Sequence, residues 1–336
     1  MFKRPTVFIL GAGASEEVKM PVGRGLADAI AKQMEVFYSQ GGDLVGKGDK
    51  GLVREIGAAI GLVEAVAAAK RLREGLPLVK SIDDFLDQNS ADQALIRVAK
   101  AAIAKSVLNA EGGSQLAYFD DQRQPHLNVA NIANTWFVKL MRMLRNSDPN
   151  HVLDNLSFIV FNYDRCLEFF LLSSLADRYD LSGEEAASII RGVPIFHPYG
   201  RVANLARLYP DGVPYGWTAG EMKPLTNNIR TYTEEISEEA RLSEMHKTLE
   251  KADNVVFLGF AFHEQNMNLL RPKAPLATKN VLGTVKDISG SNLPIVRKRL
   301  ASIFAPDAGN NLVKLHGMTC AQLFDEYELG LPVMSL

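Results

Sequence analysis

The feature that most constrains the fold is an apolar run near the start of the chain that ends in a glycine-rich turn, Thr6 to Ser15 (TVFILGAGAS). Short runs of β-branched and aromatic residues are typical of strands buried on both faces of a parallel sheet. A Gly-x-Gly directly after such a strand forms a turn whose backbone N–H groups can approach a phosphate. The stretch predicts the first strand of an α/β fold with a nucleotide site at its end. The alternative is a tight turn that binds nothing.

Composition excludes several classes of protein. With 336 residues, 47% of them apolar and 23% charged, the chain can bury a large core. Its formal charge of 37 − 39 = −2 gives no indication of a nucleic-acid partner. The 2 cysteines, Cys166 and Cys320, form no Cys-x-x-Cys pair, which argues against a four-thiolate zinc site and a secreted disulfide scaffold. No segment approaches the ~20 apolar residues of a membrane span. We expect a cytoplasmic protein without a membrane partner.

The remaining strand and helix patterns alternate along the chain. Apolar runs predict further strands, and three- and four-residue spacing predicts helices between them, for example over 293–304. This alternation indicates a Rossmann-like, doubly wound parallel sheet with helices on both faces. The predicted strands cover residues 156–161, 192–196, 254–260, 280–285 and 311–316.

Two stretches fall outside that alternation. Residues from about 41 to 150 are rich in Ala and Leu with helical spacing, which predicts a largely helical insertion. Before this insertion we expect a helix from Leu26 through Phe37, and within the insertion a mobile polar break over 41–51 and one long helix over 129–144. Residues 201–236 lack periodicity and are predicted to be an irregular excursion. We treat residues 1–336 as one domain.

Four predicted strand ends carry polar or glycine residues: Gly11–Ser15, Asn162–Asp164, His197–Gly200 and Gly259–His263. Ligands of open parallel sheets bind beyond the carboxyl ends of the strands, so the convergence of these ends is the main functional signal. Glu16 stands where the dinucleotide fingerprint has its third glycine, and no acidic strand end follows about 20 residues later. An ordinary dehydrogenase is therefore disfavoured.

Individual residues at these ends allow more than one interpretation. Asn162 can hold a ribose hydroxyl or a water, whereas Asp164 is first of all a cap of the following helix. His197 can act as a general base, although a lone histidine at a strand end is more often a plain hydrogen-bonding group. His263 lacks the spacing of a metal site, and Ser15 lacks the Gly-x-Ser-x-Gly elbow of a hydrolase.

Four motifs together resemble a known family. They are Phe8–Ser15 with Pro21–Gly23, Val160–Asp164 with Glu168, Phe196–Gly200, and Val256–Phe260. In content and order they resemble the sirtuin-like NAD-hydrolase domains of bacterial antiphage defence, such as the Thoeris effector. The resemblance spans residues 5 to about 325, and a helical block between the first two motifs is typical of these proteins.

The resemblance implies that NAD binds as a substrate at the carboxyl edge of the sheet. Asn162 takes the place of the family's catalytic Asn. The family has a catalytic His directly before a Gly, but here Tyr199 precedes Gly200. This departure leaves His197 as the expected base, with Tyr199 as the alternative. Asp164 completes the expected catalytic group. The residues expected to bind NAD are Gly11, Ala12, Gly13 and Ser15 near the phosphates, Gly283 and Thr284 near the adenosine, and Pro21, Gly23, Gly200, Gly259 and Phe260.

The implied activity is cleavage of the nicotinamide N-glycosidic bond to give nicotinamide and ADP-ribose, with antiphage defence by NAD depletion. A catalytically silent module that senses NAD or ADP-ribose is the alternative. A zinc-free protein deacylase is a lesser one, because deacylase sirtuins usually carry a four-cysteine zinc ribbon. The family also leads us to expect a homo-oligomer, an activator or partner protein, and no metal.

Overall fold

A six-stranded parallel sheet forms the centre of the computed structural model, which describes residues 2–236, 239–273, 276, 280–304 and 313–333. Its strand order is β10-β9-β8-β1-β6-β7, and all five neighbouring pairs run parallel. The strands are β1 (Thr6–Leu10), β6 (Leu156–Val160), β7 (Ile195–Phe196), β8 (Asn254–Leu258), β9 (Asn280–Thr284) and β10 (Val313–His316). Every predicted strand is present, but the one predicted over 192–196 is shortened to β7 because Gly192 caps the preceding helix, and β6, β8 and β9 end one or two residues early. Residues 311 and 312 lie outside the described part of the chain.

The strand order creates one topological switch point. The chain leaves β1 for β6 and β7 on one side and later returns to β8 on the other side of β1. Every residue of β1 and β8 is buried, as the apolar runs predicted. Phe8 of β1 stacks on Phe158 of β6 and on Phe324, with ring centroids 5.7 and 6.1 Å apart. In open α/β sheets, ligands bind at the carboxyl ends of the strands beside such a switch point.

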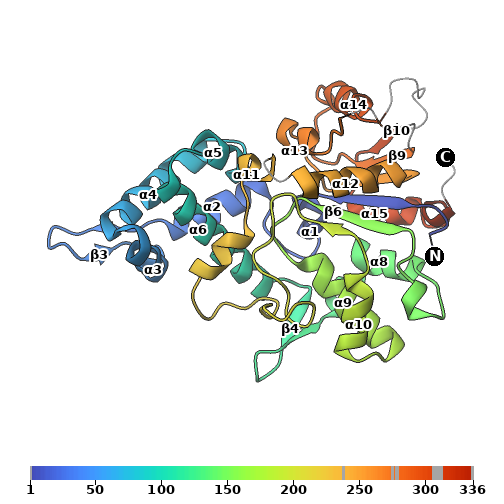
Figure 1. Ribbon diagram of the computed structural model, residues 1–336, viewed down its shortest axis with the longest axis horizontal. Coiled ribbons are helices and arrows are strands. Elements are labelled where there is room, and N and C mark those ends of the chain that lie inside the picture. Colours follow the sequence, from blue (N-terminus) through green and yellow to red (C-terminus); the bar gives the residue numbers. More distant parts are fainter. Residues whose placement is uncertain (1, 237–238, 274–275, 277–279, 305–312, 334–336) are drawn as a thin grey trace.

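Helices cover both faces of the sheet. In Figure 1, α8, α9 and α10 lie below the strands, and α13 and α14 lie above them. This arrangement confirms the Rossmann-like, doubly wound α/β class. The helices outside the insertion are α1 (Ala12–Glu16), α9 (Cys166–Tyr179), α10 (Gly183–Arg191), α11 (Tyr232–Ile236), α12 (Glu239–Lys251), α13 (Glu264–Leu269), α14 (Leu293–Ala301) and α15 (Cys320–Glu326).

The predicted insertion is largely helical, and its part from α3 to α6 extends to one side of the sheet (Figure 1). Its long helix α6 is buried along most of its length because its Ala-rich faces are packed by α2 and α4. The helix α2 (Gly23–Gln33) precedes the insertion, whose helices are α3 (Lys50–Ile60), α4 (Leu62–Gly75), α5 (Ile82–Gln88), α6 (Gln93–Gly112), α7 (Val129–Ile132) and α8 (Trp136–Met143), with 3₁₀ turns at Leu76–Leu78 and Pro149–His151. Two antiparallel hairpins, β2 (Phe37–Tyr38) with β3 (Leu44–Val45) and β4 (Ala117–Phe119) with β5 (Pro125–Leu127), were not predicted.

Three predictions between residues 26 and 144 are wrong, and two of them concern residues 26–51. The helix expected through Phe37 ends at Gln33, and the expected mobile break is a hairpin folded against the helix end. Gly48 N donates to Glu35 O at 2.9 Å, and a Cβ on Gly46 would lie 2.0 Å from the same oxygen. Only glycine allows this close approach, so the contact ends the helix early.

The single helix expected over 129–144 is two helices, α7 and α8. The break follows Ile132, and α8 begins at Trp136 because the Glu17 carboxylate accepts a hydrogen bond from Trp136 N at 2.9 Å. A distant side chain thus supplies the acceptor that starts the second helix.

The excursion over 201–236 is mostly irregular, as predicted, apart from a 3₁₀ turn at Lys223–Asn228 and α11. Arg165 holds it from beneath, donating to Val213 O at 2.8 Å and to Pro214 O at 3.0 Å. The same guanidinium pairs with Glu111 of α6 at 2.6 Å, and both side chains are fully buried. This ion pair joins the excursion, the insertion and the turn after β6.

Candidate functional site

The larger of two cavities in the described part of the chain lies at the carboxyl edge of the sheet, at the switch point between β1 and β8. Its volume is about 900 Å³, and it is lined by residues that follow β1, β6, β8 and β9 and by residues of the insertion. Pockets of roughly 300–1,000 Å³ are typical of sites for small molecules and cofactors.

The glycine turn after β1 packs closely on the end of β8. Gly11 N donates to Leu258 O and Gly13 N to Gly259 O, each at 3.0 Å. Gly259 has a φ of +55°, and a Cβ there would lie 2.1 Å from Ala14 N. The glycines therefore serve first to let two backbones touch. Two of the N–H groups predicted to approach a phosphate are instead used within the fold.

On β9, Thr284 reaches the cavity and Gly283 does not. Thr284 Oγ1 accepts a hydrogen bond from Gly259 N at 2.8 Å, which fixes the loop after β8. A Cβ on Gly283 would lie 3.2 Å from both Leu315 and Phe257 side-chain atoms, so this glycine relieves packing inside the sheet.

Asn162 lies on the cavity wall with its amide orientation fixed. Its Nδ2 donates to Gly11 O and to Ser15 Oγ, both at 3.1 Å. Because Gly11 O can only accept, the nitrogen must face it, and both amide hydrogens are used. Oδ1 makes no hydrogen bond within the described part of the chain and is not a buried atom. It is thus an acceptor available to a ligand in the cavity.

Ser15 and Asp164 hold this amide from behind. Ser15 Oγ donates to Asp164 Oδ1 at 3.2 Å, and the same oxygen accepts from Cys166 N at 3.1 Å, in the first turn of α9. The N-cap of α9 is Arg165, so the N-cap predicted at Asp164 is wrong by one residue, although the Asp164 carboxylate still accepts from the first N–H of the helix. Burial raises the pKa of the Asp164 carboxyl. Both residues are buried away from the cavity.

His197 also lies behind Asn162 and does not line the cavity. Its Nε2 is 2.8 Å from Glu168 Oε1 and its Nδ1 is 3.4 Å from Asn162 O, so both ring nitrogens face groups of the protein. Burial alone raises the pKa of the Glu168 carboxyl, but His197 and Arg201 outweigh burial and hold that pKa at about 2. In this position the imidazole supports Asn162 rather than touching a ligand.

Tyr199 lines the cavity as a neutral phenol. Its OH donates to Asn266 Oδ1 at 2.8 Å, and burial raises its pKa well above the ordinary tyrosine value. The next residue, Gly200, has a φ of +70°, and a Cβ there would lie 1.8 Å from Asn228 O. Gly200 is therefore required by the turn and lies outside the cavity.

Aromatic rings form an apolar part of the wall. Phe161 meets Phe260 edge to face at 5.1 Å and Tyr199 at 6.0 Å between ring centroids. Phe262 also lines the cavity, with a φ of +54°, and Arg299 Nη1 donates to its carbonyl at 2.7 Å. Such a wall suits a flat ring of a ligand.

Sequence reasoning missed Asp83, which the insertion contributes to the cavity wall. Asp83 lies in the first turn of α5 and accepts a hydrogen bond from the Tyr163 hydroxyl. Burial raises the pKa of its carboxyl to about 6, against the opposing effect of that hydrogen bond. The motif Ser81-x-x-Asp84 signals a helix start, and Ser81 Oγ does accept from Asp84 N at 3.1 Å. It does not signal that Asp83 faces a cavity.

The structure thus brings together only part of the predicted site. The residues that line the cavity are Gly11, Ala12, Gly13, Gly23, Asn162, Tyr199, Gly259, Phe260 and Thr284. The predicted residues that do not line it are Ser15, Pro21, Asp164, His197, Gly200 and Gly283. Within the described residues, no three His, Cys, Asp or Glu side chains are placed to share a metal ion. No helix in the same part of the chain is long and apolar enough to cross a membrane.

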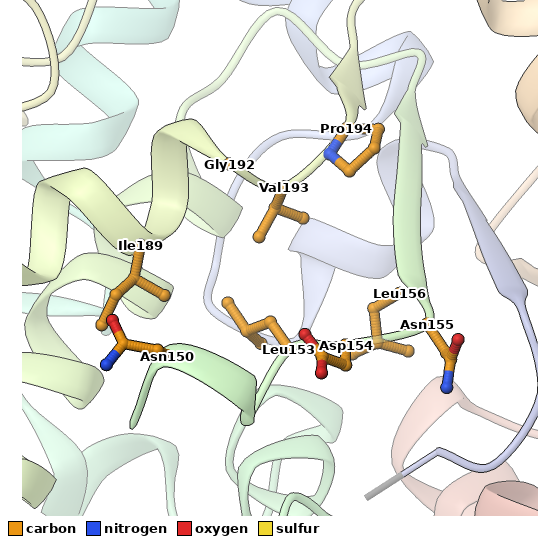
Figure 2. Close-up of a pocket in the computed structure, with 9 residues that line it drawn as sticks. All are labelled: Asn150, Leu153, Asp154, Asn155, Leu156, Ile189, Gly192, Val193 and Pro194. Atoms are coloured by element: carbon orange, nitrogen blue, oxygen red, sulfur yellow. The ribbon is translucent and has the colours of Figure 1, made fainter. Parts of the chain in front are cut away.

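A smaller cavity of about 220 Å³ lies at the opposite, amino-terminal edge of the sheet. Figure 2 shows Ile189, Val193 and Leu153 around it, beside the start of β6. Its carboxylate, Asp154, is hydrogen bonded to His151 Nδ1 at 2.9 Å. With one carboxylate and no second acid or base on its wall, this cavity is not a candidate active site.

No protein-family model matches the chain, and no curated protein matches it either. The fold and the geometry of the larger cavity are therefore the features that indicate its function.

Proposed function

We propose that the protein is an NAD hydrolase that cleaves the nicotinamide N-glycosidic bond to give nicotinamide and ADP-ribose. The observation that carries the proposal is the fixed amide of Asn162, whose Oδ1 faces a cavity of about 900 Å³ at the switch point of a Rossmann-like sheet. An acceptor held in this way suits a ribose hydroxyl or an attacking water.

The chemistry asks little of the protein beyond position and environment. The nicotinamide of NAD⁺ leaves as a neutral ring because the electron pair of the C1′–N bond goes to its positively charged nitrogen. Positive charge then develops on the ribose, in an oxocarbenium-like transition state. The Asn162 oxygen stabilises that charge and orients the ribose, while Phe161, Phe260 and Tyr199 give the leaving ring an apolar surface.

The diphosphate of NAD would lie against the glycine turn without the N–H groups of Gly11 and Gly13, which bond to β8. Lysine side chains on the cavity wall, Lys19 and Lys80, supply positive charge for it. His197 and Glu168 act as positioning residues that hold the Asn162 backbone from behind.

A non-catalytic module that senses NAD or ADP-ribose is the second candidate. One observation favours it: the histidine expected to act as the base does not line the cavity. We also propose a role in defence, self-association and an activating partner. Light scattering at several protein concentrations tests the self-association.

The decisive experiment follows nicotinamide release from NAD by chromatography, over a range of protein concentrations because we propose activation by assembly. Asn162→Ala should abolish release, whereas Asn150→Ala, an exposed amide beside the smaller cavity, should not change it. Tight NAD or ADP-ribose binding by calorimetry without any release from wild type would support the sensing module instead. Unaltered release by Asn162→Ala would remove this residue from the mechanism.

A further inference from the structure

Two acceptor oxygens face the larger cavity without a hydrogen-bond partner in the described part of the chain. One is Asn162 Oδ1. The other is Asp83 Oδ2, since the Tyr163 hydroxyl donates to Oδ1 of this carboxyl and Oδ2 is not a buried atom. Tyr163 follows Asn162 directly in the sequence, so one tight turn after β6 presents the amide and holds the carboxylate.

Neighbouring residues hold the Asp83 side chain in place. The helix that carries it is capped by Ser81, and Tyr163, which fixes its Oδ1, is itself buried. Tyr163 lies beside Tyr199, with ring centroids 6.4 Å apart, and Tyr199 is bonded to Asn266 of α13. The titratable and charged groups around this carboxyl and its two neighbouring tyrosines come from the loop before α5, from α5 itself, from the turns after β6 and β7, and from α11: Lys80, Asp84, Asp87, Tyr163, Tyr199, Tyr232, Glu234 and Glu235.

We propose that Asp83 is the general base of the hydrolysis, contributed to the sheet's cavity by the helical insertion. This inference rests on the proposed function. The water oxygen bonds to C1′ of the ribose as the C1′–N bond breaks, and the electron pair of that bond leaves with nicotinamide. The water proton passes to Asp83 Oδ2 and then to solvent, so charge and atoms balance without a further reactant. A carboxylate that activates water in this way is the usual device of inverting glycosidases.

Three other acids and bases at or near the cavity, Glu17, His197 and Tyr199, are less suited to this role. Both oxygens of Glu17 already accept backbone hydrogen bonds, from Trp136 N at 2.9 Å and Ala321 N at 2.7 Å. His197 lies outside the cavity, and burial raises the pKa of Tyr199 far above neutrality. The raised pKa of Asp83 places its proton transfer near neutral pH, where a base is most effective.

The test compares Asp83→Asn with Asp84→Asn, which removes the neighbouring carboxylate of the same helix that does not line the cavity. Asp83→Asn keeps an acceptor for the Tyr163 hydroxyl and should preserve folding, checked by thermal unfolding. Nicotinamide release should fall by about 10²–10⁴-fold, the usual contribution of a general base. The acidic limb of kcat/KM for the wild type, centred near pH 6, should disappear in Asp83→Asn and remain in Asp84→Asn.

Azide separates a base from a structural residue, because it attacks C1′ without losing a proton. Azide should restore nicotinamide release in Asp83→Asn, with a glycosyl azide as the second product, and should not restore it in Asn162→Ala. A folded Asp83→Asn variant with full release, or with an unchanged pH profile, would overturn the inference and leave the proposed function standing. Failure of the wild type to release nicotinamide at any protein concentration would overturn the proposed function, and this role of Asp83 with it.

Discussion

The close contact between the glycine turn and the end of β8 leads to a specific prediction for Gly259→Ala. At this position the backbone has a φ of +55°, and the added Cβ would lie 2.1 Å from Ala14 N and 2.2 Å from Gly13 C. No real Cβ comes so close to backbone atoms, and no flexible side chain is available to yield. The loop after β8 has to move away from the turn after β1.

The cost can be added up from the contacts that this movement breaks. A left-handed conformation costs an alanine roughly 1–2 kcal/mol. Separation of the two segments also breaks the hydrogen bond from Gly13 N to Gly259 O and the one from Gly259 N to Thr284 Oγ1. At about 1 kcal/mol each, these bring the expected loss in the free energy of unfolding to about 3–4 kcal/mol.

Urea unfolding followed by circular dichroism measures this loss. With a slope of about 3 kcal/mol per molar urea, the midpoint should fall by about 1 M. Gly290→Ala is the matched control, because a Cβ there meets nothing within 4 Å and the backbone needs no positive φ. It should change stability by less than about 0.5 kcal/mol. If Gly259→Ala unfolds at the midpoint of the control, the close-approach explanation of these glycines is refuted.

Two further predictions concern buried charges. Arg165→Met leaves the fully buried Glu111 carboxylate without its partner and should lower the free energy of unfolding, measured in urea, by about 3–5 kcal/mol. The double variant Arg165→Met, Glu111→Leu should recover part of that loss. Equal stability of the single variant and the wild type would contradict this prediction. The pKa of Glu168 is about 2 in the folded protein, against an ordinary value of 4.5. The ionised carboxylate therefore stabilises the folded state by about 3 kcal/mol above pH 4.5, and this stabilisation is lost as the pH falls from 4.5 toward 2. The difference between the urea midpoints at pH 6 and pH 3 should therefore be smaller in Glu168→Gln than in the wild type. An equally large fall of the midpoint in both proteins would show that other groups control acid unfolding.

Those parts of the fold whose signals are local could be predicted from the sequence. The strands β1, β6 and β8 are almost wholly buried, so their apolar runs stand out. The hairpin at Phe37 could not be predicted in the same way, since it depends on the approach of Gly46 and Gly48 to Glu35. The start of α8 likewise depends on Glu17, which is distant in the sequence.

The residues of the site likewise fall into those that the strand pattern places and those that distant contacts place. The topology of a parallel sheet places Asn162 at a strand end, so its location on the cavity followed from the strand pattern alone. Which way a strand-end side chain points depends on its partners, and Glu168 of α9 holds His197 behind the wall. Asp83 comes from the insertion, and only the packing of α5 against Tyr163 brings it to the cavity.

The turn after β6 has a consequence for which sequences this fold can tolerate. Four consecutive residues there have four separate partners: Asn162 faces the cavity, Tyr163 bonds to the insertion, Asp164 accepts from the first N–H of α9, and Arg165 enters the buried ion pair. Loss of one residue would move every one of these side chains to its neighbour's place. In a library of single-residue deletions, this turn should therefore be among the least permissive segments of the chain, although it is a loop and loops ordinarily accept such changes.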